Sequence, residues 1–401
     1  LASAVAMALA AGCQAQDTVV TVDTSVRYQT ILGWGKTTPW APAPRLARDI
    51  VIDRAVNDLG ITRLRYEPPA GNRPGARAWE WLNDNDDPRE INWDALSVEV
   101  LDQSAREWLV PFKNAIEAHG DPFNIYVSPS FFDTGSSGSV PPWYLRDPEE
   151  YAEFAASVLL RLRDRWGITA DYYCICNEAG NHNAFTPQVV ADMIRATVPR
   201  LREYGLPTMI QFPESINVGV AMRYIEALQD QADIWPHIGL IAYHLYGNNT
   251  RLPHLREFAF ARGLPTAQTE FMRLTIDHLY NDLTIGEVSY WSIYGLGGPS
   301  PRGQNYYFRL NGTSFGRGRQ FWNFRQVMHY VRPGAVRVEA TSSNPAVRVL
   351  AFADGGAVTV VLINSGQGAQ QRNVTVEGLP PGEYGVSWTA GQGPYQEGGV
   401  L

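Results

Sequence analysis

Two glutamates in this chain each end a short, strand-like run of residues. Glu178 ends residues 171–178, of sequence DYYCICNE, and Glu270 ends residues 264–270, of sequence LPTAQTE. A carboxylate at the carboxyl end of a buried strand is costly to desolvate, and such positions are where barrel enzymes hold their catalytic groups. The two carboxylates therefore indicate paired acid/base and nucleophilic chemistry.

Strand candidates alternate with amphipathic helices through most of the chain. Asp147 is a predicted N-cap, and apolar residues then recur at helical spacing from Tyr151 to Trp166 before Gly167. A second helix starts at Thr186-Pro187 and stops at Gly205. Eight strands are predicted in all, at residues 30–35, 61–67, 124–129, near 173, near 210, at 239–245, near 267 and at 288–293. This order predicts an α/β fold, a (β/α)8 TIM barrel.

The pattern changes after about residue 325. Five segments alternate apolar and polar residues between Gly, Pro and Asn turns, at 336–339, 347–353, 357–364, 372–377 and 385–389. They predict an attached antiparallel β-sandwich side domain. The predicted organisation is a leader remnant at 1–16, a strand at 17–27 contributed to the side domain, the barrel at 28–325 and the side domain at 326–401.

The first 13 residues are small and apolar and end in Ala-Ala-Gly-Cys13. This stretch is typical of the end of a bacterial export signal, and Cys13 is a candidate for lipidation. We expect a protein outside the cytoplasm, either secreted or anchored to the membrane only through lipid on Cys13.

Charge and aromatic content narrow the possible partners. The net charge is −8 and no run of Lys or Arg interrupts it, so nucleic acid is not an expected partner. The 12 Trp and 19 Tyr residues suit a sugar-stacking cleft, although a large core would contain them too. No protein partner is evident, and a monomer is expected.

An ordered set of segments resembles the retaining glycoside hydrolases of clan A, and within it glycoside hydrolase family 30. The resemblance covers nearly the whole mature chain. It rests on residues 28–35, 60–65, the pair Asn177-Glu178, residues 243–246 (YHLY), the pair Thr269-Glu270, and residues 331–337 with 360–364.

This resemblance implies roles for individual residues. Glu178 would protonate the leaving oxygen and later activate water, and Glu270 would attack the anomeric carbon. The like charges would raise the pKa of Glu178 and keep it protonated while Glu270 stays ionised. The remaining residues implied to bind or support the substrate are Asn177, Trp34, Arg65, His244, Tyr246, Trp291 and Tyr294.

Several of these residues have structural alternatives. Arg65 could form an ion pair with Glu67, His244 and Tyr246 could be ordinary barrel residues, and both tryptophans could be packing residues. Further candidates for the cleft are Glu214, Gln268 and the loop 180–185. Two positions depart from the family pattern: Phe131 and Phe132 stand where many members have Trp after Ser-Pro, and Tyr294 replaces a second Trp.

The expected activity is that of a retaining β-glycoside hydrolase, an endo-acting glycanase on xylan or on β-1,6-galactan or glucan. An exo-acting glycosidase and a non-catalytic carbohydrate-binding protein remain alternatives. No His-x-His or His-Glu-x-x-His spacing predicts a metal site, no Gly-x-Ser-x-Gly motif predicts a catalytic serine, and no motif implies a cofactor.

Overall fold

The computed structural model describes residues 4–6, 16–37, 45–72, 78–131, 138–298, 306–311, 314–318, 320–366, 372–390 and 393–401. Two compact units divide the chain. The larger contains residues 33–57 and 61–318, and the smaller contains residues 1–32, 58–60 and 319–401. Cys13 and Phe132 lie outside the described residues.

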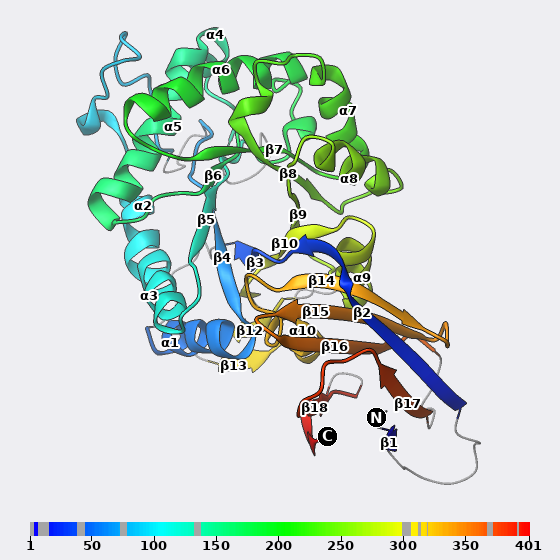
Figure 1. The fold of residues 1–401 in the computed structure, drawn as a ribbon. Coiled ribbons are helices and arrows are strands. Elements are labelled where there is room, and N and C mark those ends of the chain that lie inside the picture. The colour runs from blue at the N-terminus through cyan, green and yellow to red at the C-terminus, as the bar shows by residue number, and fades with distance from the viewer. Residues whose placement is uncertain are drawn as a thin grey trace. The chain divides into compact units, whose positions relative to one another are not determined.

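The larger unit is a closed barrel of eight parallel strands in the order β10-β3-β4-β5-β6-β7-β8-β9. Figure 1 shows helices such as α5, α6, α7 and α8 outside this ring of strands. The predicted (β/α)8 barrel is therefore confirmed. Its strands are β3 Gly33–Thr37, β4 Ile61–Tyr66, β5 Asn124–Val127, β6 Tyr172–Tyr173, β7 Met209–Ser215, β8 Ile238–His244, β9 Thr266–Glu270 and β10 Val288–Gly295.

Several helices of the larger unit begin where the sequence provides caps. Asp147 accepts a hydrogen bond from the backbone nitrogen of Glu149 at 2.9 Å, and Thr186 caps the next long helix through Val189. Both predicted helices are confirmed as α5 and α6. The set is α1 Arg45–Asp53, α2 Glu99–Ser104, α3 Val110–Ala118, α4 Pro142–Arg146, α5 Pro148–Leu160, α6 Pro187–Glu203, α7 Val218–Leu228, α8 Leu252–Phe260 and α9 Ile276–Thr284.

Short segments complete this unit. π-helical turns extend three of the helices at Arg54–Asp58, Ala105–Leu109 and Arg161–Arg165, and 3-10 turns occur at Trp93–Ala95, Ala179–Asn181 and Trp235–His237. A small sheet follows the last barrel strand and contains β11 Gly297–Gly298, β12 Phe308–Asn311 and β13 Ser314–Arg317. Among the described residues, no helix has both the length and the apolar character needed to cross a bilayer.

The smaller unit is rich in β structure, as the sequence predicts. Its six-stranded sheet has the order β1-β17-β2-β14-β15-β16. Buried side chains of this sheet form a hydrophobic core that contains Val20, Val22, Val338, Val349 and Ala351. The pairings are antiparallel except that β17 runs parallel to β2. The elements are β1 Ala4–Ala6, β2 Gln16–Thr30, α10 Phe321–Met328, β14 Val336–Ser342, β15 Val347–Asp354, β16 Ala357–Asn364, β17 Arg372–Glu377, β18 Gly385–Trp388 and β19 Gln396–Val400.

Two element boundaries differ from the sequence analysis. The first barrel strand begins at Gly33 rather than residue 30, because residues up to Thr30 continue β2 and pair with Val336 of β14. The predicted strand 171–178 is shorter, because only Tyr172 and Tyr173 pair in the barrel. Beyond them the backbone bonds irregularly to its neighbours, with the Glu178 nitrogen donating to the Glu214 carbonyl at 3.1 Å.

Candidate active site

The two glutamates that the sequence analysis selected lie close together at the carboxyl end of the barrel. One carboxylate oxygen of Glu178, one of Glu270 and a ring nitrogen of His244 all lie within 4.8 Å of one another. Glu270 is the last residue of β9, and His244, the last residue of β8, is its register partner. The parallel pairing of neighbouring strands therefore brings residues distant in sequence to one place.

The backbone at Glu178 is unusual. It has φ 53° and ψ 50°, in the left-handed region that favours glycine. Glu214, at the end of β7, also has a positive φ of 50°. Such conformations in non-glycine residues concentrate at functional sites, where neighbouring contacts hold them in place. Both glutamates thus leave the regular strand path close to the same site.

Arg65 of β4 links three of the buried carboxylates. Its guanidinium contacts Glu270 at 2.5 Å, Glu67 at 2.8 Å and Glu214 at 3.8 Å. The side chain is fully buried, and the neighbouring negative charges raise its pKa despite the opposing effect of burial. The structural ion pair with Glu67 and the contact with Glu270 therefore occur together.

His244 is the second cation among these carboxylates. Its Nδ1 lies 2.8 Å from Glu178 Oε1 and 3.9 Å from Glu270, and its Nε2 lies 3.6 Å from Glu214. Burial opposes charging of the imidazole, but the three glutamates outweigh it and raise the pKa of His244 to about 10. The imidazole consequently carries a proton at neutral pH.

The charge on His244 changes one expectation about Glu178. Burial alone would raise the pKa of Glu178, but the hydrogen bond and charge of His244, the charge of Arg65 and a hydrogen bond from Asn181 lower it. The Asn181 amide donates to Glu178 at 2.6 Å. The prediction that like charge raises the pKa of Glu178 is therefore wrong for this structure, because the neighbouring cations and donors lower this pKa and outweigh burial.

Glu214 is more central than the sequence analysis suggested. It is fully buried, accepts a hydrogen bond from Ser128 at 3.2 Å and contacts both Arg65 and His244. Burial would raise its pKa, but Arg65 and His244 lower it to about 2. The sequence pattern that could have identified Glu214 is a glutamate at the end of a buried strand, the same pattern that Glu178 and Glu270 show. Glu67 directly follows a buried strand and shows this pattern too.

Asn177 and Tyr246 are also brought to the site. Tyr246 donates from its hydroxyl to Glu270 at 3.0 Å and is partly exposed. Asn177 is 3% exposed, and its side-chain oxygen has no hydrogen-bond partner among the described residues. Such an oxygen is available to a ligand hydroxyl.

The two tryptophans do not meet the expectation that they line the sugar subsite. Trp34 and Trp291 are both fully buried and occupy paired positions of β3 and β10. Trp291 donates its indole hydrogen to Asp282 of α9 at 2.9 Å, so its side chain points outside the barrel toward the helix layer. A side chain without exposed surface cannot stack on a sugar in this conformation, and both residues are packing residues here.

The other candidates divide between the site and the core. Asn181 of the loop 180–185 contacts Glu178, whereas Phe185 packs against Phe131 with ring centroids 5.2 Å apart. Gln268 is fully buried, and its side-chain oxygen accepts from the Ser292 nitrogen at 3.4 Å. Tyr294, near the end of β10, is partly exposed.

Glu178, His244 and Glu270 are close enough to ligate one metal ion. The electrostatics disfavour this use, because Arg65 already contacts Glu270 and His244 is protonated. The arrangement is instead a set of carboxylates compensated by two fixed cations. Such a set can hold one carboxylate ionised and move a proton through another.

Comparison with known proteins identifies the fold. No protein-family model matches the chain, and no curated protein matches its sequence. Among solved structures, the catalytic domain of glycoside hydrolase family 30 xylanase C from Talaromyces cellulolyticus matches with a TM-score of 0.72 and 17% identity, covering 94% of both chains.

Two further structures match over similar lengths. A conserved exported protein from Bacteroides fragilis has a TM-score of 0.72 at 15% identity and 96% coverage of both chains. An endo-β1,6-glucanase has a TM-score of 0.67 at 16% identity, covering 92% of this chain and 91% of its own. The fold of this chain, a TIM barrel with a β-rich side unit, is therefore the fold that structures of glycoside hydrolase family 30 have.

Proposed function

We propose that this protein is a retaining β-glycoside hydrolase that uses Glu178 as acid/base and Glu270 as nucleophile. The observation that carries the proposal is the placement of a Glu178 oxygen within 4.8 Å of a Glu270 oxygen. Retaining enzymes hold their two carboxyl groups about 5 to 5.5 Å apart, whereas inverting enzymes need roughly 6.5 to 9.5 Å to admit a water.

The contacts of Glu270 and Glu178 fit a reaction in two steps. Arg65 and Tyr246 both donate to Glu270, which orients its carboxylate for attack on the anomeric carbon. The bond between that carbon and the leaving oxygen breaks as the oxygen takes a proton from Glu178. Water then attacks the glycosyl ester while Glu178 removes its proton, and Glu270 leaves.

The proton for the first step is shared by Glu178 and His244. A protonated imidazole beside a carboxylate holds the same number of protons as a neutral imidazole beside a carboxylic acid. Since 2.8 Å separates His244 Nδ1 and Glu178 Oε1, the proton can pass to Glu178 when a sugar displaces water from the site. The low pKa of Glu178 in the free protein is therefore compatible with a role as general acid.

The substrate we propose is a β-linked polysaccharide, cut within the chain. Family 30 xylanases and an endo-β1,6-glucanase have this fold, which favours xylan or a β-1,6-linked glucan or galactan. We also propose that the protein acts outside the cytoplasm, since an exported protein matches it over 96% of its length and its first 13 residues are typical of an export signal. An exo-acting glycosidase is the alternative, distinguished by the size of the first products.

The test compares wild type, Glu270→Gln and the control Glu257→Gln, whose side chain on α8 is 64% exposed. Reducing-end release is measured on xylan, β-1,6-glucan, β-1,6-galactan and aryl β-glycosides, with product sizes recorded. Glu270→Gln should lose activity by about 10⁴-fold or more, because no ester can form, and Glu257→Gln should match wild type. Activity that survives Glu270→Gln would exclude the proposed nucleophile.

A second measurement separates the two carboxylates. With an activated aryl glycoside, Glu178→Ala should still form the glycosyl ester, and azide should accelerate its breakdown to a glycosyl azide of retained configuration. Azide added to Glu270→Ala should give the inverted azide. The opposite pattern would mean that the two roles are exchanged.

A further inference from the structure

Glu214 is connected to Glu178 in two ways. Its backbone carbonyl accepts a hydrogen bond from the Glu178 nitrogen at 3.1 Å. Its carboxylate lies 3.6 Å from Nε2 of His244, whose Nδ1 lies 2.8 Å from Glu178 Oε1. Glu214, at the end of β7, therefore contacts both the backbone of the proposed acid/base and the imidazole beside it.

The facing atoms of Glu214 and His244 have no other hydrogen bonds. Glu214 Oε1 and His244 Nε2 are both buried, and neither has a hydrogen-bond partner among the described residues. At 3.6 Å they form an ion pair that is longer than a hydrogen bond. Catalytic hydrogen bonds are often long before a substrate binds and shorten in the complex. Glu214 Oε1 is therefore the acceptor that the structure offers to a hydrogen on Nε2.

Other side chains hold the Glu214 carboxylate in place from several strands. Ser128, which follows β5, donates to Oε2 at 3.2 Å, and Arg65 of β4 lies 3.8 Å from Oε1. The charge of Glu214 also acts on the thiol of Cys174, which follows β6, and on the phenol of Tyr126 in β5. The carboxylate is fully buried, so it has a fixed position from which to orient His244.

The hydrogen on Nε2 decides which proton His244 gives up. A charged imidazole carries a hydrogen on both ring nitrogens, and the partner of one nitrogen sets which hydrogen stays. With Nε2 facing Glu214, the hydrogen that leaves is the one on Nδ1, which faces Glu178. A buried carboxylate orients the imidazole of a serine protease in the same manner.

We propose that Glu214 is a positioning residue that keeps a hydrogen on Nε2 of His244 and so directs the Nδ1 proton to Glu178. This inference rests on the proposed function, because it assigns the path of the proton in that reaction. In the first step, the N–H bond at Nδ1 breaks, Glu178 takes the proton and then gives it to the leaving oxygen. In the second step, Glu178 takes a proton from the attacking water and returns it to Nδ1, which restores the charged imidazole.

The first experiment follows the imidazole itself and needs no substrate. The chain has seven histidines, so protein labelled with ¹⁵N only in histidine gives a small set of ring signals, and those missing from His244→Gln identify His244. In the wild type, both ring nitrogens of His244 should show the charged form at pH 8, since its pKa is about 10. A neutral His244 at this pH would overturn the proposal without any variant of Glu214.

Glu214→Gln then tests the contact. One of the negative charges that face His244 is removed, so the imidazole should lose its charge at a pH lower by roughly one unit or more. The neutral wild-type imidazole should carry its hydrogen on Nε2. In Glu214→Gln the amide both accepts and donates, so the neutral imidazole should become a mixture of the two tautomers. Unchanged titration and tautomer in this variant would contradict the proposal.

The second experiment asks whether Glu214 acts through His244. The pH dependence of kcat/KM on an aryl glycoside is measured for Glu214→Gln, His244→Gln and the double variant. The alkaline limb should move to lower pH in Glu214→Gln, and adding this change to His244→Gln should move the limb no further. Glu214→Asp keeps the charge and should restore most of the shift. A further shift in the double variant would mean that Glu214 acts on another group.

Glu67→Gln is the buried control. Glu67 contacts Arg65 at 2.8 Å, as Glu214 does at 3.8 Å. In the described part of the chain, the ion pairs of His244 are to the glutamates at 178, 214 and 270. Glu67→Gln should therefore leave the titration of His244 and the alkaline limb in place, even if turnover falls. A shift equal to that of Glu214→Gln would show a general effect of buried charge instead.

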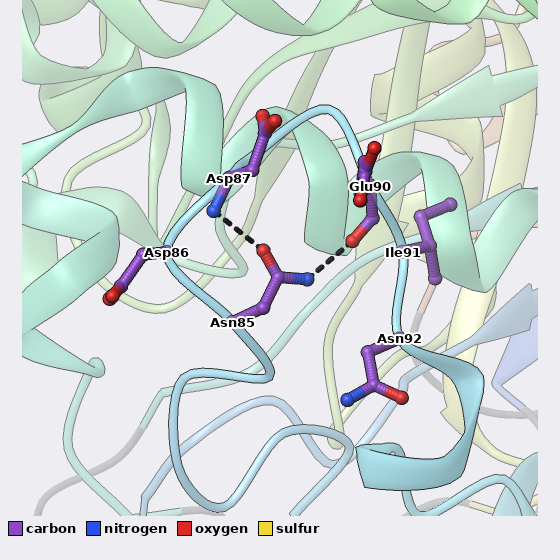
Figure 2. Close-up of a pocket in the computed structure, with 6 residues that line it drawn as sticks. All are labelled: Asn85, Asp86, Asp87, Glu90, Ile91 and Asn92. Carbon is purple, nitrogen blue, oxygen red and sulfur yellow. Dashed lines mark hydrogen bonds between the residues drawn. The ribbon is translucent and has the colours of Figure 1, made fainter.

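Glu90→Gln is the exposed control. Figure 2 shows Glu90 on the turn that Asn85 closes, where the Asn85 side chain accepts from the Asp87 nitrogen at 2.6 Å and donates to the Glu90 carbonyl. The Glu90 residue is exposed, and the turn uses its backbone rather than its carboxylate. This variant should match the wild type in both experiments.

The two experiments fail separately. A protein that cleaves no glycan but whose His244 responds to Glu214→Gln would overturn the hydrolase proposal and leave the contact between Glu214 and His244 in place. An active hydrolase whose His244 does not respond would overturn only the role of Glu214.

Discussion

At the scale of residues, the candidate active site brings together more negative side chains than positive ones. Four glutamates, at 67, 178, 214 and 270, share two cations, Arg65 and His244. Each cation contacts more than one carboxylate, so removing either leaves buried negative charge uncompensated. The proton that catalysis needs is bound within this network rather than by an isolated glutamic acid.

The shared proton leads to a prediction for His244→Gln. In wild type the pair of His244 and Glu178 retains its proton until the pH approaches the His244 pKa of about 10. Without the imidazole, only Glu178 can bind that proton, and a carboxyl group loses it at lower pH. The alkaline limb of the kcat/KM profile should move to lower pH by roughly one unit or more. An alkaline limb at the wild-type position would contradict proton sharing.

At the scale of elements, close contacts between neighbouring strands set the geometry of the site. A Cβ on Gly35 of β3 would lie 2.2 Å from the Ser292 hydroxyl of β10 and 3.4 Å from the Arg63 backbone oxygen of β4. Glycine at this position therefore permits β3 to pair with both neighbours. Arg65 follows two residues after Arg63, so a shift of β4 would move the guanidinium that contacts Glu270.

We expect Gly35→Ala to lower both stability and activity. Overpacking a buried position of this kind costs about 1 to 3 kcal/mol in the free energy of unfolding, and displacement of Arg65 should reduce kcat. Gly385→Ala is the matched control, because no atom lies within 4 Å of its added Cβ. Urea unfolding and aryl-glycoside kinetics check both variants. A Gly35→Ala protein as stable and active as the control would mean that the strands adjust without cost.

At the scale of the whole molecule, hydrogen bonds to a buried carboxyl group connect the barrel to its helix layer. Asp282 of α9 accepts hydrogen bonds from Tyr243 of β8 at 2.8 Å and from Trp291 of β10 at 2.9 Å. Burial raises the pKa of Asp282 to about 7, although both hydrogen bonds oppose the shift. The stability of the larger unit is therefore linked to pH at a position outside the active site.

Protonated Asp282 stabilises the folded state, so its contribution is greatest at acid pH. The folded protein binds the Asp282 proton more tightly than the unfolded chain does, so this contribution is complete below about pH 4 and is lost as pH rises through 7. A shift of this size corresponds to roughly 4 kcal/mol at most. Unfolding by urea at pH 4 to 8 should show that Asp282→Asn gains stability relative to wild type as pH rises.

The exposed variant Asp94→Asn controls for the general effect of removing one negative charge. It should follow the pH dependence of the wild type throughout. If Asp282→Asn follows the same curve as well, Asp282 is not the group responsible, and its carboxyl is ionised in the folded protein at neutral pH.

The sequence by itself determined the barrel, the β-rich side unit and the positions of Glu178 and Glu270. Alternation of strands and capped helices is a local pattern, and Asp147 and Thr186 occur where helices begin. Each glutamate also ends a short strand-like run, so its position near the carboxyl end of a strand could be predicted without coordinates.

Only the tertiary structure decided what these residues contact. Trp291 points toward the helix layer because its indole donates a hydrogen bond to Asp282 of α9. The protonation of His244 depends on glutamates from three different segments of the chain. The lowered pKa of Glu178 and the central position of Glu214 follow from the same convergence. Pattern and spacing are local properties of the chain, whereas burial and electrostatic coupling depend on groups that only the closed barrel brings together.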